Sequence, residues 1–260
     1  ADIHPYQAED EVQGALEVFY GLEEMLKEMT GLAAVSLQPA AGAHGELTGL
    51  LCIRAYHRDR GDEGRRTVLI PDSAHGTNPA SATLAGLEAV PLKSGEDGGV
   101  DLDDLEARLD ASTAALMLTN PSTLGLYEKN IREIARRLHE AGALLYMDGA
   151  NFNALVGLVR PGDSGVDVMH INMHKTFSTP HGGGGPGSGP IAVSSALEPF
   201  LPVPRIVRTG GRFALDYRRP KSIGRVKAFA GQAAMVWRAY AYLRSHSRED
   251  LREVARNAVL

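Results

Sequence analysis

The chain has 260 residues and a formal net charge of −5, with 43% hydrophobic and 23% charged residues. This size and balance suit one globular domain with a sizeable core, and they give no electrostatic reason to expect nucleic acid or an anionic membrane as a partner. No apolar run approaches the roughly 20 residues that a membrane-spanning helix needs. The single cysteine, Cys52, excludes an internal disulfide and favours a buried helical thiol in a cytoplasmic protein.

Helical and extended segments alternate along the chain. Apolar residues at three- and four-residue steps from Val12 to Met29 predict a helix that ends at Gly31. Short apolar runs predict six strands, at 67–71, 89–92, 114–119, 143–148, 167–173 and 190–194. We expect further helices at 101–109 with Asp101 as N-cap, at 128–142 with Gly142 as C-terminal glycine, and at 225–243 with an apolar stripe of Phe229, Ala233, Val236, Trp237 and Tyr240.

This alternation predicts an α/β domain with a mostly parallel sheet and helices on both faces, because several strands are apolar throughout. We expect a single domain over 1–260, made of an N-terminal helix region (1–31), a sheet core (32–200), and a loop with a C-terminal helix (201–260). The helical pattern continues into the last residues, "VARNAVL", which suggests a fragment or a processed chain.

Polar or glycine-bearing loops follow four of the predicted strands, at 72–79, 120–125, 148–153 and 174–177. The carboxyl ends of parallel strands lie at one edge of a sheet, and open α/β sheets bind ligands there. We therefore expect these loops to form a ligand site together.

Lys175 follows the apolar segment 167–173, and a partly desolvated strand end favours the uncharged amine. Such an amine reacts with aldehydes, so pyridoxal 5'-phosphate (PLP), held as a Schiff base, is the expected cofactor. An ordinary surface lysine is the common alternative. We place the preceding residue, His174, among the cofactor-binding residues as well.

The pyridine ring of PLP needs a carboxylate beside its nitrogen, and Asp148 ends the predicted strand 143–148. A helix-cap or turn aspartate is the alternative for this residue. The small Ala150 would let a flat ring lie against the backbone, and Asn151 would lie near the phenolic oxygen of the ring. His75 would cover the second ring face, although a core or turn histidine is commoner.

The residues Gly42, Ala43, His44 and Gly45 form a small-residue turn that leads into a helix. Amides at such a helix start bind anions, so we expect the cofactor phosphate there. Neither this turn nor the glycine run 182–185 completes a nucleotide-binding motif. His44 is the one basic residue near the turn in sequence, which suggests that a partner chain supplies further donors.

Three histidines, His170, His174 and His181, raise the alternative of a metal site. In one strand, His170 and His174 would lie roughly 13 Å apart. No cysteine or acidic residue is close in sequence, so we expect no metal.

These residues lie in stretches that resemble the glycine decarboxylase P-protein family of the glycine cleavage system, and subunit 2 of its two-subunit bacterial forms. The glycine-rich signature after Lys175 is the most specific of them. In chain order the stretches are "DIHPYQ", "QPAAGAHGELTGL", "IRAYH", "PDSAHGTNPASA", "NPSTLG", "YMDGANFNA", "RPGD" and "HKTFSTPHGGGGPGSGP", followed by "LPVP" and "RPKSIGR".

The resemblance implies the aspartate-aminotransferase-like fold, PLP fold type I, with this chain as its large domain. Lys175 would be the Schiff-base lysine, Asp148 the pyridinium partner and His75 the ring-stacking residue, with Asn151 and the turn 42–45 as further cofactor contacts. The family subunit extends beyond both ends of this chain, by an upstream segment with a cysteine and by a C-terminal small domain.

The reaction implied is decarboxylation of glycine, with release of CO2 and transfer of the aminomethyl group to the lipoyl arm of H-protein. The implied partners are glycine, lipoylated H-protein, and a homologous subunit 1-like chain or a second copy. His174 and His181 are candidate ligands of the glycine carboxylate, and the backbone of 181–185 could approach the cofactor closely. Two alternatives remain: another fold type I lyase, such as an aldolase or a cysteine desulfurase, and an inactive truncated domain.

Overall fold

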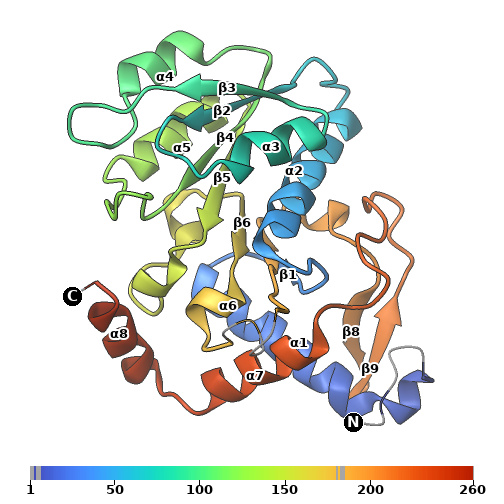
Figure 1. The fold of residues 1–260 in the computed structure, drawn as a ribbon. Coiled ribbons are helices and arrows are strands. Elements are labelled where there is room, and N and C mark those ends of the chain that lie inside the picture. The colour runs from blue at the N-terminus through green and yellow to red at the C-terminus, as the bar shows by residue number, and fades with distance from the viewer. Residues whose placement is uncertain (1–2, 4–6, 180, 182–184, 260) are drawn as a thin grey trace.

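A seven-stranded sheet runs through the centre of the molecule (Figure 1). The computed structural model describes residues 3, 7–179, 181 and 185–259. The strands lie in the order β1-β7-β6-β5-β4-β2-β3. Neighbouring strands from β3 to β6 are parallel, whereas β7 is antiparallel to both β6 and β1. The bounds are β1 Ala34–Ser36, β2 Thr67–Pro71, β3 Glu88–Leu92, β4 Thr113–Thr119, β5 Leu144–Gly149, β6 Val168–Ile171 and β7 Ile191–Val193.

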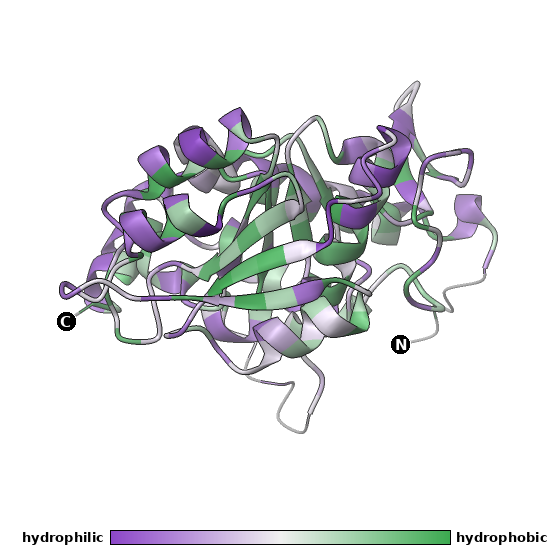
Figure 2. Cartoon of the chain, turned by 90° about the horizontal axis from the view of Figure 1, so that it is seen from above, coloured by the Kyte–Doolittle hydropathy of each residue, from purple (hydrophilic) through white to green (hydrophobic). Residues whose placement is uncertain are grey.

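Helices cover both faces of the sheet, as the strand composition predicts. Residues that alternate along the strands belong to two hydrophobic clusters: Leu144 and Tyr146 of β5 join one, and Leu145 and Met147 join the other. The helices α2 (Gly42–Asp59) and α3 (Thr77–Leu84) pack in the first cluster. The second contains residues of α1 (Gln13–Thr30), α4 (Leu102–Arg108), α5 (Ile131–Glu140) and α7 (Ala233–Arg244). Hydrophobic residues accordingly gather along the central strands, and hydrophilic ones on the outer helices (Figure 2).

Local sequence signals account for several helix ends. α1 ends at Gly31, which has φ of 72°, a left-handed conformation that glycine adopts without strain. The Asp101 side chain accepts hydrogen bonds from the amides of Asp103 and Asp104 and so caps α4 as predicted. The last helix, α8 (Arg248–Asn257), begins with a capping box between Ser247 and Asp250.

Glycines let α2 lie unusually close to the sheet. A Cβ on Gly45 would lie 2.6 Å from the carbonyl oxygen of Gly189, and one on Gly49 would lie 2.6 Å from the Tyr146 ring. Cys52 lies on the same helix and is fully buried, as the sequence predicts, and burial raises the pKa of its thiol.

The structure corrects several predicted boundaries. The strand expected at 167–173 ends at Ile171, and the chain turns at once into the short helix α6 (Met173–Thr176). The helix expected at 225–243 begins only at Ala233, because the preceding segment packs against residues 37–38. The predicted stripe on it is therefore partly wrong: Val236 is buried, but Phe229 and Trp237 are exposed.

Some elements escape the sequence patterns altogether. Among the described residues they are the three-residue strand β1, the helix α3, the hairpin of β8 (Arg205–Thr209) and β9 (Arg212–Asp216), and 3-10 helices at Glu9–Glu11, Phe152–Ala154, Pro161–Ser164 and Glu198–Phe200. The helical pattern noted in the last residues overlaps the end of α8. Within the described residues, none of the helices combines the length and the apolar character that crossing a membrane requires.

Candidate active site

The predicted site loops meet at one edge of the sheet. Thr119 of β4 pairs with Asp148 of β5, and Gly149 of β5 pairs with Ile171 of β6, so the three strands end side by side. β2 runs parallel to β4 and ends at the same edge, before the loop that holds His75. The topology therefore brings His75, Asp148 and Lys175 to one edge from three separate parts of the chain.

Asp148 is a buried carboxylate with two hydrogen-bond donors and a neighbouring imidazole. Its side chain is 3% exposed, and it accepts from the Ala150 amide at 2.9 Å and from Asn78 Nδ2 at 3.0 Å. His170 Nε2 lies 3.2 Å from the same carboxylate. On its other side, the ring of His170 meets the hydroxyl of Tyr146, with 3.0 Å between Nδ1 and the phenol oxygen. The bond from Ala150 is that of a turn aspartate, but the burial and the side-chain donors go beyond a turn and hold the carboxylate in one orientation.

Lys175 lies on α6, immediately after β6, and its side chain is exposed. This corrects the expected environment, because the lysine is not at a partly desolvated strand end. The chain has already left the strand and begun a helical turn before it. Among the described residues, its amine has no ion-pair or hydrogen-bond partner, so it is available to a ligand.

His75 is exposed and lies on the loop before α3. Its Nδ1 lies 2.6 Å from the Thr77 hydroxyl oxygen and 3.2 Å from the Thr77 amide nitrogen. The imidazole is therefore oriented by the first turn of α3. Of the two commoner alternatives, a core histidine does not describe this exposed residue, whereas a turn histidine does fit its contacts with Thr77.

Asn151 connects two of the loops. Its Nδ2 donates to the carbonyl oxygens of Pro121 and Ser122, at 3.0 and 3.2 Å. The amide group thus holds the loop after β5 against the loop after β4. Contact with a ligand would involve its remaining oxygen.

The start of α2 presents three backbone amides. Gly45 N donates to the carbonyl of Ala41, so this glycine belongs to the helix and serves close packing. Gly42, Ala43 and His44 have no acceptor for their amides among the described residues. The Asn172 side chain occupies the space that a Cβ on Gly42 would need.

A lysine distant in sequence adds charge beside this turn. Burial lowers the pKa of His44, and the positive charge of Lys227 lowers it further. Lys227 is partly buried, and this burial lowers its own pKa. The expectation that His44 is the one basic residue near the turn is therefore wrong, because the segment 225–232 lies beside the turn instead of continuing a helix.

The histidines of the glycine-rich segment form a pair of rings. The rings of His174 and His181 have centroids 4.4 Å apart, and His174 Nδ1 accepts from the Ser188 amide at 3.3 Å. Burial, then His181 and Lys175, lower the pKa of His174, which favours a neutral imidazole beside the lysine. The expected approach of the backbone at 182–184 concerns residues outside those that the structure describes.

The argument about a metal site used the distance between His170 and His174 in one regular strand, and the structure does not place them in one strand. His174 lies on α6 and not in one strand with His170, so the distance of a regular strand does not apply. His170 instead approaches Glu46 and Asp148, and one ligand atom from each of these three buried residues lies within 4.8 Å of the others. Each of these atoms already has a hydrogen-bond partner in the protein.

Glu46 is a site residue that the sequence reasoning missed. It is 4% exposed and accepts hydrogen bonds from Thr77, Asn78 and Ser81. The sequence holds one signal for it: the residue stands between Gly45 and Gly49, on the glycine-bearing stretch that packs against the sheet.

Comparisons with known proteins identify the family. The family profile described as "Glycine cleavage system P-protein" matches residues 1–257. The chain belongs to the glycine cleavage system P-protein family. It is 57% identical over 259 residues to a probable glycine dehydrogenase (decarboxylating) subunit 2 of Caldanaerobacter subterraneus subsp. tengcongensis, covering 100% of this chain and 53% of that protein. A Bacillus licheniformis protein of the same description is 59% identical, with 99% and 53% covered.

A solved P-protein shares the fold. The crystal structure of glycine decarboxylase (P-protein) of the glycine cleavage system, in inhibitor-bound form, matches with a TM-score of 0.78 and 25% identity. The match covers 97% of this chain and 58% of that one. The architecture is thus the predicted fold type I α/β domain. The chain spans about half the length of the curated P-protein relatives it matches.

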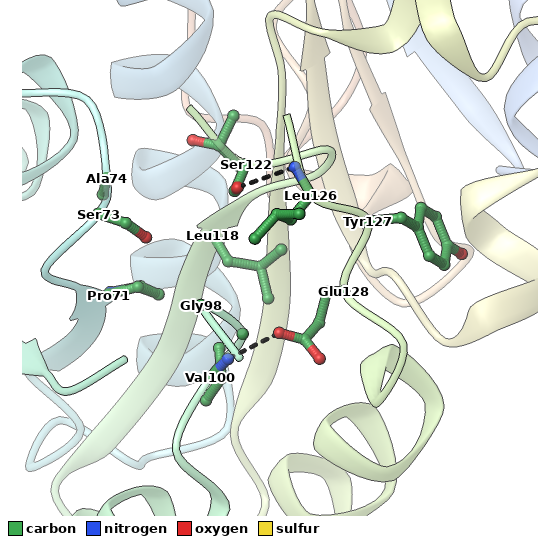
Figure 3. A pocket seen from close by; sticks show the side chains of 12 residues that line it. Pro71, Ser73, Ala74, Gly98, Val100, Leu118, Ser122, Leu126, Tyr127 and Glu128 are labelled. Carbon is green, nitrogen blue, oxygen red and sulfur yellow. Dashed lines mark hydrogen bonds between the residues drawn. The ribbon is translucent and has the colours of Figure 1, made fainter. Parts of the chain in front are cut away.

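The structure also contains a small cavity beside the P-protein site loops (Figure 3). It has a volume of about 30 Å³ and lies between Pro71 and Ser73 on one side and Tyr127 and Glu128 on the other. Glu128 anchors it by accepting from the Val100 amide at 2.8 Å. The volume suits an ordered water and not a cofactor. None of the predicted site residues lines this cavity.

The predicted site residues fit a flat, anionic cofactor. A buried carboxylate at Asp148 suits a cationic ring nitrogen, and three free amides with the charge of Lys227 suit a phosphate. The absence of a side chain at Gly42 makes room for the Asn172 side chain beside the helix start.

Proposed function

We propose that this chain is the cofactor-binding part of an aminomethyl-transferring glycine dehydrogenase. The reaction is PLP-dependent decarboxylation of glycine with transfer of the aminomethyl group to the lipoyl arm of H-protein and release of CO2. The observation that carries the proposal is the arrangement at the sheet edge. Asp148 is buried at the end of β5, where two N–H groups donate to it and His170 lies close, and Lys175 follows the neighbouring strand in a chain of the P-protein family.

Each predicted residue has a defined task toward the cofactor. Lys175 would bind its aldehyde covalently, and Asp148 would face the ring nitrogen. His75 would cover one ring face, with Ala150 and Asn151 at the ring edge. The amides of Gly42, Ala43 and His44, together with the charge of Lys227, would hold the phosphate. When bound, PLP supplies an electron sink for the carbanion that decarboxylation leaves.

The residues of the chain tune this chemistry electrostatically. The Asp148 side chain accepts hydrogen bonds from the Ala150 amide and Asn78 Nδ2, and a carboxylate held in this way would favour a proton on the ring nitrogen. His174, whose pKa is lowered by burial and then by His181 and Lys175, would be available to take or return a proton beside the lysine. His174 and His181 are also the candidates for fixing the glycine carboxylate, which must be held in one position for CO2 to leave.

The proposed partners follow from the family and from this division of tasks. They are glycine, lipoylated H-protein, and a subunit 1-like chain or a second copy of this one. The single cysteine supports a cytoplasmic location, and we retain the division into a helix region (1–31), a sheet core (32–200) and a C-terminal part (201–260) of one large domain.

The decisive experiment is isotope exchange. The assembled protein should exchange labelled CO2 with the carboxyl group of glycine, and the exchange should depend on a lipoylated carrier. Exchange of an α-hydrogen without CO2 exchange would point to another fold type I lyase. Cofactor binding with neither exchange would point to an inactive domain.

A further inference from the structure

A second buried carboxylate lies beneath the proposed cofactor site and has no task in the reaction described above. Glu46 is on the second turn of α2 and accepts three hydrogen bonds. Thr77 Oγ1 donates at 2.8 Å, Asn78 Nδ2 at 3.1 Å and Ser81 Oγ at 3.0 Å. All three donors come from α3, so one acidic side chain binds the start of that helix to α2.

Two of these donors also hold the proposed cofactor contacts. The hydroxyl oxygen of Thr77 lies 2.6 Å from His75 Nδ1. The Nδ2 of Asn78 donates to Asp148 at 3.0 Å. Thr77 therefore connects Glu46 to His75, which is predicted to cover the ring face. Asn78 connects Glu46 to Asp148, which is predicted to face the ring nitrogen.

The orientation of the Asn78 amide group depends on the two carboxylates that accept its hydrogen bonds, Glu46 and Asp148. Its amide nitrogen has two N–H groups, and one points to Glu46 while the other points to Asp148. Its oxygen is buried and has no partner among the described residues, so nothing on that side fixes the amide. A flipped amide would direct oxygen at two carboxylates. The charge of Glu46 therefore keeps the N–H groups directed at Asp148.

The Thr77 hydroxyl is controlled in the same way. An ionised carboxylate only accepts hydrogen bonds, so the single hydroxyl proton points to Glu46. The hydroxyl oxygen then faces His75 Nδ1 and, with the Thr77 amide at 3.2 Å, fixes the imidazole at the end of its loop.

We infer that Glu46 is a positioning residue: through Thr77 it orients His75, and through Asn78 it orients Asp148, the two side chains predicted to contact the cofactor ring. This inference rests on the proposed function. It predicts that a change at Glu46 disturbs the orientation of the bound ring, although Glu46 does not touch the ring itself.

The test compares three variants of the assembled holoenzyme. Glu46→Gln removes the charge with little change of shape. Thr77→Val removes the hydroxyl that joins Glu46 to His75 and leaves the link through Asn78 in place. Ser81→Ala is the matched control, because Ser81 is buried and donates to the same carboxylate but contacts neither His75 nor Asp148 in the hydrogen bonds described. The measurements are the dissociation constant of PLP, the visible circular dichroism of the bound cofactor, and the thermal midpoint without cofactor.

Glu46→Gln should weaken PLP binding by about tenfold or more and reduce the dichroic band, whereas Ser81→Ala should stay within about twofold of wild type. Thr77→Val should fall between them. If Glu46→Gln matches Ser81→Ala in both cofactor measurements, or lowers only the thermal midpoint, Glu46 is a structural residue and the inference is overturned. If the wild-type protein binds no PLP, the proposed function fails first and the inference with it.

Discussion

At the scale of single residues, the candidate site combines side chains that hydrogen bonds hold in one orientation with an exposed lysine. Asp148 accepts two hydrogen bonds and lies beside His170, and His75 contacts Thr77. Lys175 is exposed and has no partner within the described part of the chain. This arrangement suits the predicted roles. Lys175 must be free to form and break a covalent bond, whereas Asp148 and His75 must keep a fixed orientation.

Lys175→Ala should leave the thermal stability nearly unchanged, because the side chain is exposed, and should abolish covalent attachment of PLP, because only an amine forms that bond. Borohydride reduction of wild-type holoenzyme followed by peptide mapping should place the label on Lys175. Lys221, an exposed lysine that pairs with Asp59, provides the matched control as Lys221→Ala. A label on any other residue would contradict the assignment.

Lys227→Met tests the charge beside the predicted phosphate turn. Removing a positive neighbour should raise the pKa of His44, since that charge disfavours the protonated imidazole. It should also weaken PLP binding by about tenfold, because the phosphate is close to dianionic. An NMR titration of His44 and a cofactor titration measure the two effects. An unchanged PLP affinity with a raised His44 pKa would place the phosphate elsewhere.

At the scale of elements, burial between α1 and the β8–β9 hairpin creates a pH-dependent contact. Glu23 on α1 is buried, and its pKa is raised to about 7, first by burial and against the lowering effect of Arg205. Two guanidinium nitrogens of Arg205 on β8 are buried without a hydrogen-bond partner among the described residues. Arg205 thus interacts with Glu23 electrostatically but without a hydrogen bond among the described residues. Burial therefore outweighs the effect of Arg205 and favours the neutral form of Glu23.

The titration of Glu23 makes the stability of the folded chain depend on pH. In the unfolded chain this carboxyl titrates near its ordinary pKa of 4.5, and in the folded chain its pKa is about 7, so the folded state holds the proton more strongly. Stability should fall as pH rises through that window, by about 3 kcal/mol at most. Glu23→Gln should remove this loss. Urea unfolding at about pH 5 and about pH 8 measures it, with the exposed Glu24→Gln as control. An unchanged pH dependence in Glu23→Gln would show that the carboxyl is not the titrating group.

At the scale of the whole molecule, the chain matches about half of each P-protein relative, and its predicted site residues are gathered at one edge of the sheet. Lys227 adds positive charge beside the predicted phosphate turn from within the chain, which weakens one reason for expecting donors from a partner. The exposed side chains of Leu124, Leu126 and Tyr127 on the loop after β4 still leave apolar surface beside the site.

We therefore keep the prediction that the functional unit is at least a pair of homologous chains and that PLP affinity falls when the pair separates. Sedimentation and the visible absorbance of the bound cofactor should be followed together across a dilution series. Absorbance should decrease as the pair dissociates. A monomer that keeps its full absorbance well below the association range would contradict this prediction.

Local sequence predicted many of the elements and proposed the site residues. Short apolar runs were sufficient for β2, β4 and β5, because a strand buried on both faces must be apolar throughout. The run at 89–92 also marked β3, of which only Leu92 is buried. Asp101 and Gly31 marked helix ends, because capping depends on neighbouring residues only. The site loops followed from the same pattern, since parallel strands end at one edge.

Tertiary structure alone decided the contacts that join distant segments. Lys227 reaches His44, and Glu46 reaches Asn78, only because α2 packs against α3 and the segment 225–232 packs beside residues 37–44. β1 is too short for a periodic signal, and the helical pattern at 225–232 is overridden where Gly231 lies against the Leu37 carbonyl. Such pairings depend on packing between elements, which the sequence around each residue does not encode.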